Sequence, residues 1–271
     1  MNKKRQSNSD LYKIKVLHKA FRLLELFNNE EVEELSAPEI TERLRYTQPT
    51  VFRLISNLED EGYLEKNIET GKYRLGMRLF FLGSRVKPFH FLKNAARPLL
   101  IKLNRQTGET VHLAVLHKHE VLYLDKIHSS HTVRVVISRV GKKLPAHCSG
   151  VGKVLLAHSS MEEVKEAVED SGLPAFTANT ITTWNRLKEE LEKIRQQGFA
   201  IDNEEIEIGL KCVAAPVFVN DQVVAALSVS IPKDRFDQAG VDLPQAVMNT
   251  AKELSAVLTE SSINAKRSGH R

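Results

Sequence analysis

The stretch SAPEITERLRYTQPTVFRLISNLEDEGYLEK, residues 36–66, contains two short helical patterns joined by a tight turn. Ser36 and Glu39 form the capping box that begins a helix, and this first pattern ends near Arg45. The second pattern begins after Thr47, which we expect to be its N-cap. Apolar residues recur in it at helical spacing and predict a buried stripe made of Val51, Leu54, Ile55 and Leu58.

The other face of the second predicted helix carries mainly polar side chains. Its outward residues are Gln48, Thr50, Phe52, Arg53 and Asn57. Arginine can donate two hydrogen bonds to guanine, glutamine or asparagine can pair with adenine, and threonine can reach a phosphate. Two short helices with such a face are typical of a helix-turn-helix that reads the major groove of DNA. Ordinary surface helices also expose polar residues, so spacing alone leaves both interpretations open.

The sequences on both sides of this stretch complete a small domain. Before it, a helix ending at residues 28–29 is predicted by the helical spacing of Val16, Ala20, Leu23, Leu24 and Phe27. After it, two strand-like runs around the turn-prone residues 69–71 predict a β-hairpin. A hairpin directly after a recognition helix is a wing. Its basic residues, which we expect to meet the phosphate backbone, are Lys66, Lys72 and Arg74.

The composition is that of a soluble chain with a basic start. Its 271 residues are 42% hydrophobic and 27% charged, with a net charge of +5. No apolar stretch approaches the roughly 18 residues of a membrane span, and residues 1–10 lack a signal peptide's apolar core, so we expect a cytoplasmic protein. The two cysteines form no disulfide framework and the histidines show no metal-ligand spacing, so neither cofactor nor metal is expected. The basic residues within 1–22 fit either a polyanion partner or a solvated tail.

From residue 110 onward the pattern changes to strand hairpins with inserted helices. Strands are predicted over 110–130 with a turn at 118–119, over 131–138, over 199–205, and over 210–232 with a turn at 220–221. Helices are predicted over 149–158, 162–170, 187–197 and 243–258, and before the strands a linker helix over 77–82 and the first helix of the second domain over 89–103. This mixture indicates an α+β domain built on a curved antiparallel sheet.

The segment PAHCSGVGKVLLAHSS, residues 145–160, allows three interpretations: a His147–Cys148 catalytic pair, a phosphate cradle, or an anion-binding wall. The cradle lacks the first glycine of a P-loop, and Val154 follows the lysine where a magnesium-binding hydroxyl is required. Adjacent side chains usually point apart, so the His–Cys pair is poor support for a dyad. A helix that starts near Ser149 offers free N–H groups to a small anion.

Polar residues on two later strands fit the same wall. Ser228 and Ser230 are two residues apart and therefore face the same side of a strand, and Asp202 follows a strand. Exposure to water would account for the serines equally well, and a turn would account for the aspartate. Cys212 lies in an apolar run, where a core cysteine is the commoner explanation.

Several segments in a fixed order resemble the isocitrate lyase regulator (IclR) family of bacterial transcription factors, from about residue 13 to residue 261. They are SAPEITERLRYTQPTVFRLISNLEDEGYLEK, KYRLGMRLFFLG, GKKLPAHCSGVGKVLLA, FTANTIT, GFAIDNEEIEIGLKCVAAPVF and VVAALSVSIP. The sequence departs from the family pattern at Arg45, where glycine often occupies the turn, and at Phe52, where a polar residue is frequent.

The resemblance implies an α+β chain with an N-terminal winged helix-turn-helix, a linker helix and a C-terminal GAF/PAS-like effector domain, usually assembled as a homodimer or tetramer. We place a basic tail over 1–12, the DNA-binding domain over 13–75, the linker helix over 76–95, the effector domain over 96–262 and a flexible tail over 263–271.

The resemblance also implies an effector pocket in the C-terminal domain. The positions matching the pocket of the family are Val136, Leu144, Gly150, Val151, Asp202, Leu210, Cys212, Ser228 and Ser230. On this interpretation Gly150 and Val151 offer N–H groups to an anionic head, and Cys212 is a wall thiol and not a nucleophile.

We therefore expect a cytoplasmic DNA-binding transcriptional regulator and not an enzyme, most simply a repressor of a catabolic operon. Its expected partners are double-stranded operator DNA, a small carboxylate-bearing effector (a sugar acid, keto acid or aromatic acid) and a second copy of itself, without a membrane. Two alternatives stay open: a small-molecule hydrolase with a DNA-binding appendage, and a constitutive DNA-binding protein whose second domain only oligomerises.

Overall fold

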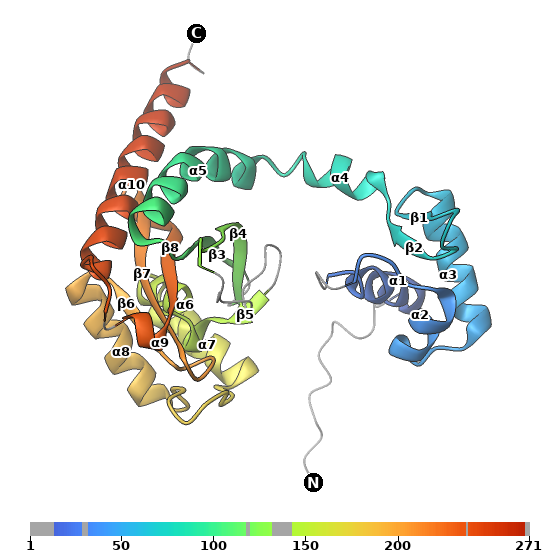
Figure 1. Ribbon diagram of the computed structural model, residues 1–271, viewed down its shortest axis with the longest axis horizontal. Helices are drawn as coiled ribbons and strands as arrows, with labels where there is room; N and C mark the ends of the chain where they lie inside the picture. The colour runs from blue at the N-terminus through green and yellow to red at the C-terminus, as the bar shows by residue number, and fades with distance from the viewer. Residues whose placement is uncertain (1–13, 29–31, 118–119, 132–142, 237, 269–271) are drawn as a thin grey trace. The chain divides into compact units, whose positions relative to one another are not determined.

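The computed structural model describes residues 14–28, 32–117, 120–131, 143–236 and 238–268. The chain divides into two compact units, Met1–Lys87 and Pro88–Arg271 (Figure 1). The first consists of helices and a two-stranded hairpin, and the second of helices around a six-stranded sheet. The predicted α+β class is confirmed.

The first unit is a winged helix-turn-helix. Its elements are α1 (Lys15–Glu25), α2 (Ala37–Leu44), α3 (Gln48–Asp60), β1 (Leu64–Lys66), β2 (Tyr73–Leu75) and α4 (Met77–Gly83). The predicted capping box is present, because the Ser36 N–H donates to Glu39 Oε2 at 2.7 Å while the Glu39 N–H donates to Ser36 Oγ. The turn after α2 places Arg45 in the left-handed region with φ of 55°, where glycine is otherwise common.

The core of the first unit follows the predicted apolar stripes, except that Leu58 of the stripe predicted to be buried is only half-buried. Leu23, Val51 and Ile55 are buried and pack with residues from α2 and the hairpin. Val16, by contrast, is 59% exposed. It lies in the first turn of α1, and the core packs mainly on the later part of that helix. Val16, one of the residues whose spacing predicted this helix, therefore lies outside the core.

Residues 76–95, which we assigned to the linker, are not one continuous helix. The structure divides them between α4 and the start of α5 (Lys87–Thr107), in agreement with the separate helices expected over 77–82 and 89–103. Proline disfavours helical geometry in the residue before it and is tolerated in a first turn, so Pro88 marks the beginning of a new helix. At the other end of the chain, α10 (Leu243–Ser268) continues past residue 258. Residues 263–268 of the flexible tail expected over 263–271 therefore belong to this helix.

The second unit contains a curved antiparallel sheet in the order β5-β4-β3-β8-β7-β6. Its strands are β3 (Thr110–His117), β4 (Glu120–Ile127), β5 (Lys143–Pro145), β6 (Ala200–Asn203), β7 (Leu210–Val219) and β8 (Gln222–Pro232). The expected turn between β7 and β8 is confirmed, with positive φ at both Asn220 and Asp221. The expected turn at 118–119 and nearly all of the strand expected over 131–138 lie outside the described residues.

Helices cover both faces of this sheet (Figure 1). α5 and α10 pack on one face around the larger apolar core. The other face holds the second core, against helices α6 (Gly150–Ala157), α7 (Met161–Ser171) and α8 (Trp184–Gln197). The short helical turn η2 (Ala146–Cys148) leads into α6, and α9 (Lys233–Phe236) follows β8.

Strand alternation gives the two faces different chemistry. The face toward α5 and α10 carries larger apolar residues, such as Val213, Leu227 and Val229. The face toward α6 carries the small residues Ala114, Ala214 and Ala226. Farther along the same strands, two or four residues away, stand His112, Cys212, Ser228 and Ser230. Because side chains alternate with a period of two, these polar residues share the α6 face and lie at one end of it.

Candidate functional sites

A cavity lies between the start of α6 and the polar end of the sheet. It is lined by Tyr123, Leu144, Ser149, Gly150, Val151, Asp202, Ile206, Leu210, Cys212, Ser228 and Ser230. The structure thus brings together every described position that the resemblance implied, and Val136 lies outside the described residues. Three lining residues were not among the expected pocket residues: Tyr123, Ser149 and Ile206. Burial alternates along β4 and places Tyr123 on the buried side, but the run of apolar residues at 121–124 gives no such alternation in the sequence.

One rim of the cavity is the N-terminus of α6. Ser149 caps this helix, because its Oγ accepts a hydrogen bond from the Gly152 N–H at 3.2 Å. The first N–H groups of a helix have no acceptor within the helix and carry its positive dipole end. Gly150 lies close to the sheet, since a Cβ there would stand 3.4 Å from the Cβ of Ala214. This rim can therefore receive a small anion.

The opposite wall is a chain of buried polar side chains. Cys212 Sγ lies 3.0 Å from Ser230 Oγ, and the hydroxyls of Ser228 and Ser230 each lie 3.4 Å from His112 Nδ1. The His112 ring packs edge-on against Tyr123. Burial lowers the pKa of His112 to about 3, so the imidazole is neutral. Both serines are under 5% exposed, so their exposure to water is ruled out.

Asp202 stands at the same wall, on β6 opposite Cys212. It is 1% exposed; its Oδ1 accepts a hydrogen bond from the Glu205 N–H at 2.8 Å, and its Oδ2 is buried without a hydrogen-bond partner among the described residues. Burial raises the pKa of Asp202 to about 7, and the Glu205 carboxylate also raises it, while the Glu205 N–H and Lys153 oppose the rise. A buried carboxyl with an unused oxygen is a group that a ligand can satisfy.

The two cysteines do not have the environment of a nucleophile. His147 Nε2 lies 3.0 Å from the Pro174 carbonyl, whereas the Cys148 thiol points at the Pro145 carbonyl. Burial raises the pKa of Cys148 to about 12 and raises that of Cys212 well above its usual range. Both thiols are protonated near neutral pH, and the thiolate is the reactive form. The side chains of His147 and Cys148 thus interact with two different carbonyl groups.

Within the part of the chain that the structure describes, no group of three or more His, Cys, Asp or Glu side chains is placed to hold a metal ion. The described helices also include none that is both long and apolar enough to cross a membrane.

The outward face of α3 is the candidate base-reading surface. Gln48, Phe52, Arg53 and Asn57 are exposed on it. Thr50 is half-buried, with its Oγ1 2.9 Å from that of Thr47. The Asn57 amide donates to the Arg53 carbonyl in the preceding turn, so the helix itself uses one of its donors. The guanidinium of Arg53 is the strongest hydrogen-bond donor on this face.

The wing presents the predicted basic residues to solvent. Lys66 and Arg74 are exposed, and Lys72 is half-buried. Arg74 lies 3.4 Å from Glu65, and Lys72 lies 3.6 Å from a carboxylate oxygen of Glu39. Ion pairs between exposed side chains are weak and screened by salt, so a phosphate can replace either carboxylate at little cost.

Both halves of the chain match family models. The IclR helix-turn-helix domain matches residues 16–67, and the bacterial transcriptional regulator IclR C-terminal domain matches residues 89–256. The chain belongs to the IclR family. It is a DNA-binding transcription regulator with an effector domain.

Individual relatives match over most of their length. The HTH-type transcriptional regulator XynR of Escherichia coli is 36% identical over 227 residues, which cover 83% of this chain and 89% of XynR. The transcriptional repressor IclR of Escherichia coli is 33% identical over 221 residues, covering 80% of each chain. A crystal structure of an IclR homolog from Microbacterium hydrocarbonoxydans, complexed with 4-hydroxybenzoate, matches with a TM-score of 0.78 and 29% identity, covering 89% of this chain and 98% of the homolog.

Asp202→Asn is expected to flatten the pH dependence of stability between about pH 4 and pH 7. Folding raises the pKa of Asp202 from 3.8 to about 7, so the folded protein keeps a proton that the unfolded chain releases. The stability that this bound proton gives to the folded state is fully present below pH 4 and is lost as the pH rises through 7. Urea denaturation at a series of pH values measures it, with Asp221→Asn in an exposed turn as the control. Equal pH slopes for wild type and Asp202→Asn would contradict the assignment.

Proposed function

We propose that this IclR-family regulator is a cytoplasmic repressor of a catabolic operon, which a small carboxylate releases from its operator by binding in the cavity at the start of α6. The observation that carries the proposal is the pairing of a helix N-terminus with the unpartnered Oδ2 of buried Asp202 across one cavity. The complex of the Microbacterium hydrocarbonoxydans homolog with 4-hydroxybenzoate and the repressor role of the Escherichia coli relative both support it.

The cavity binds an anion without a cationic side chain among those lining residues that the structure describes. The carboxylate of the effector is held at the N–H groups of Gly150 and Val151, where the α6 dipole favours negative charge. The rest of the effector faces Asp202, Ser228 and Ser230, which hold its hydroxyl or keto oxygens. A ligand without these oxygens leaves buried polar groups unpaired and binds more weakly.

Binding changes transcription by shifting a population. A regulator that pairs two recognition helices on two half-sites binds tightly only when their spacing fits the operator. The effector favours arrangements that do not fit, to the extent that it binds them more tightly than the others. Neither step requires chemistry on the effector, which separates this proposal from a hydrolase.

Asp202→Asn and Ser228→Ala are each expected to weaken effector binding about 5- to 100-fold. Ser228→Ala removes a buried hydroxyl, and Asp202→Asn replaces a carboxyl oxygen by an NH2 group that cannot accept a hydrogen bond, and each mismatch costs about 1–3 kcal/mol. Calorimetry with 4-hydroxybenzoate, a keto acid and a sugar acid identifies the binding class in wild type and then measures both variants. Ser255→Ala, whose hydroxyl lies on α10 and bonds to the Ala251 carbonyl, is the matched control.

Two results would contradict the proposed effector site. One is undiminished binding of the same acid by both variants, which would place the site elsewhere. The other is consumption of the acid, followed by NMR over hours, which would favour the hydrolase. If none of the three classes of acid changes the affinity for the operator, that result would favour a constitutive DNA-binding protein.

Arg53→Ala is expected to relax base preference at one operator position and to lower affinity by about 1–3 kcal/mol, since a bidentate contact with guanine is lost. Lys72→Ala is expected to weaken all sequences alike and to reduce the salt dependence, because a phosphate contact is lost. Fluorescence anisotropy with a mutated operator series at several salt concentrations separates the two. Lys188→Ala, exposed on α8, is the control. If Arg53→Ala changes neither affinity nor base preference, the recognition surface is wrongly assigned.

We propose that the regulator is a homodimer, or a tetramer built from dimers, in which α4 contacts a second copy. All of α4 lies in the described part of the chain, and none of its residues is buried. Its exposed apolar side chains are Met77, Phe80, Phe81 and Leu82, each more than half exposed. A second copy accounts for this surface because one recognition helix reads too few base pairs for specificity in a genome.

The double variant Phe80→Ser/Phe81→Ser is expected to shift the regulator toward monomer and to weaken operator binding, because it removes two aromatic anchors from the contact. Sedimentation equilibrium at micromolar concentration measures the shift. Phe176→Ser removes an exposed aromatic residue of the other unit and serves as the control. A wild-type protein that is monomeric at that concentration, or a double variant that assembles like wild type, would overturn this contact.

A further inference from the structure

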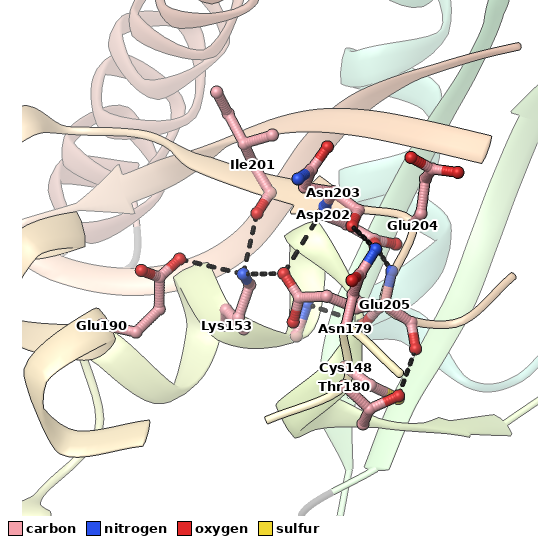
Figure 2. Close-up of polar contacts among 12 residues, drawn as sticks. Cys148, Lys153, Asn179, Thr180, Glu190, Ile201, Asp202, Asn203, Glu204 and Glu205 are labelled. Atoms are coloured by element: carbon pink, nitrogen blue, oxygen red, sulfur yellow. Dashed lines mark hydrogen bonds and ion pairs between the residues drawn. The ribbon is translucent and has the colours of Figure 1, made fainter. Parts of the chain in front are cut away.

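Lys153 is a lysine whose ammonium group is completely paired inside the effector domain. Its residue is 1% exposed, and its Nζ donates to Glu205 Oε1 at 2.5 Å, to the Ile201 carbonyl at 2.7 Å and to Glu190 Oε1 at 2.9 Å (Figure 2). An ammonium group has three donors, and these three acceptors match them. Burying a lysine is costly unless it is paired in this way, so the position needs an explanation.

The partners of Lys153 adjoin the cavity. Ile201 immediately precedes Asp202, and Glu205 immediately precedes Ile206; Asp202 and Ile206 both line the cavity. Lys153 itself stands one turn after Gly150 on the helix whose N-terminus forms the rim. The ammonium group therefore joins the two sides of the cavity from behind, α6 on one side and residues 201–206 on the other.

Residues 201–206 adopt a backbone shape that needs support. Glu204 has φ of 60°, a left-handed conformation that is uncommon for residues other than glycine and persists where the surroundings impose it. The hydroxyls of Thr177 and Thr180 hold the carbonyls of Glu204 and Glu205. These contacts fix the backbone from one side, and the Lys153 pair fixes the Glu205 side chain from the side of α6.

We propose that Lys153 is a positioning residue of the effector cavity: by holding Glu205 and the Ile201 carbonyl, it fixes residues 201–206 against α6 and sets the place and the charge environment of Asp202 in the cavity wall. This inference rests on the proposed role of the cavity, but its tests use neither effector nor DNA. A failure of the inference and a failure of the proposed function are therefore distinguishable.

Two charged groups act on Asp202 with opposite signs. The Glu205 carboxylate raises the pKa of Asp202, and the Lys153 ammonium lowers it. The other ionisable groups that interact with Asp202 are Cys148 of η2, Tyr123 of β4 and Cys212 of β7, and burial raises the pKa of each of them. These three are uncharged near neutral pH, so Lys153 and Glu205 are the charged groups that modify a pKa which burial has already raised.

The first test measures the titration of Asp202 by NMR with aspartate carrying ¹³C at Cγ, assigned by its loss in Asp202→Asn. Glu205→Gln is expected to lower the titration midpoint. Adding Lys153→Met to Glu205→Gln is expected to raise it again, while adding Glu190→Gln instead is expected to leave it in place. A merely structural role for Lys153 does not predict these opposite shifts. Midpoints that coincide in Glu205→Gln with and without Lys153→Met would overturn the electrostatic part of the proposal.

The second test measures the cavity wall through the alkylation of Cys212 by iodoacetamide in a Cys148→Ser background. Lys153→Met is expected to speed the alkylation of Cys212 because residues 201–206 are no longer held against α6. Lys153→Met leaves Glu205 buried and unpaired, so Lys153→Met/Glu205→Gln tests the same contact with both charges removed. Glu190, which is part-exposed, remains hydrated in this variant.

Global unfolding also exposes Cys212, so each rate is compared with the unfolded fraction from urea denaturation. If Lys153 has the positioning role, Cys212 in Lys153→Met/Glu205→Gln is alkylated faster than the unfolded fraction of that variant explains. Cys212 in Glu190→Gln is alkylated at the wild-type rate. An alkylation rate in the double variant that equals the wild-type rate, or that unfolding fully explains, would overturn the proposal.

Discussion

The complete burial of α6 is the constraint on which the effector domain depends. All eight of its residues are buried between the sheet and the helices of the same face. The sheet meets it with alanines, and Gly152 has no room for a side chain, because a Cβ there would stand 2.2 Å from the Ala146 carbonyl oxygen. A helix held this closely on every side has a fixed N-terminus, and that N-terminus forms the rim of the cavity. The same burial requires that Lys153, on the same helix, find partners for all of its donors.

Local signals in the sequence predicted the helix-turn-helix, and the structure shows why. A capping box, a tight turn and a helical stripe each extend over only a few residues. Ser36 and Glu39 therefore predict the start of a helix, and Val51 predicts the buried side of the next helix, without information from the rest of the chain. Local patterns do not contain information on how far a neighbouring element extends. The ends of α5 and α10 and the exposure of Val16 depend on that extent, so the sequence did not predict them. Strand periodicity placed Ser228 and Ser230 on one side of a strand but left open whether that side is buried. Only the packing of α6 on that face decides it.

The candidate site was predicted through resemblance where physical reasoning stopped. Gly150 and Asp202 are 52 residues apart in the sequence and line one cavity, and no spacing rule connects them. The lysine of the Gly-Val-Gly-Lys segment illustrates the same difficulty. The sequence suggested that this lysine could belong to a phosphate-binding loop, and the missing hydroxyl after it argued against that loop. The sequence gave no indication of the residues that contact the lysine in the fold. Glu190 and Glu205 lie 37 and 52 residues farther along the chain, and only the folded arrangement brings them to Lys153.

If the cavity is the effector site that we propose, the two faces of the sheet divide stability from ligand recognition. Residues such as Val213, Leu227 and Val229 point into the core with α5 and α10 and hold each strand in place. Cys212, Ser228 and Ser230 alternate with them and face the cavity, so the wall that they form is as rigid as that core. A ligand shifts a population only through parts that differ between the two states. Residues 201–206 lie at the edge of the sheet, and several of the contacts that hold them come from side chains, so this segment is better placed than the central strands to respond to what the cavity contains.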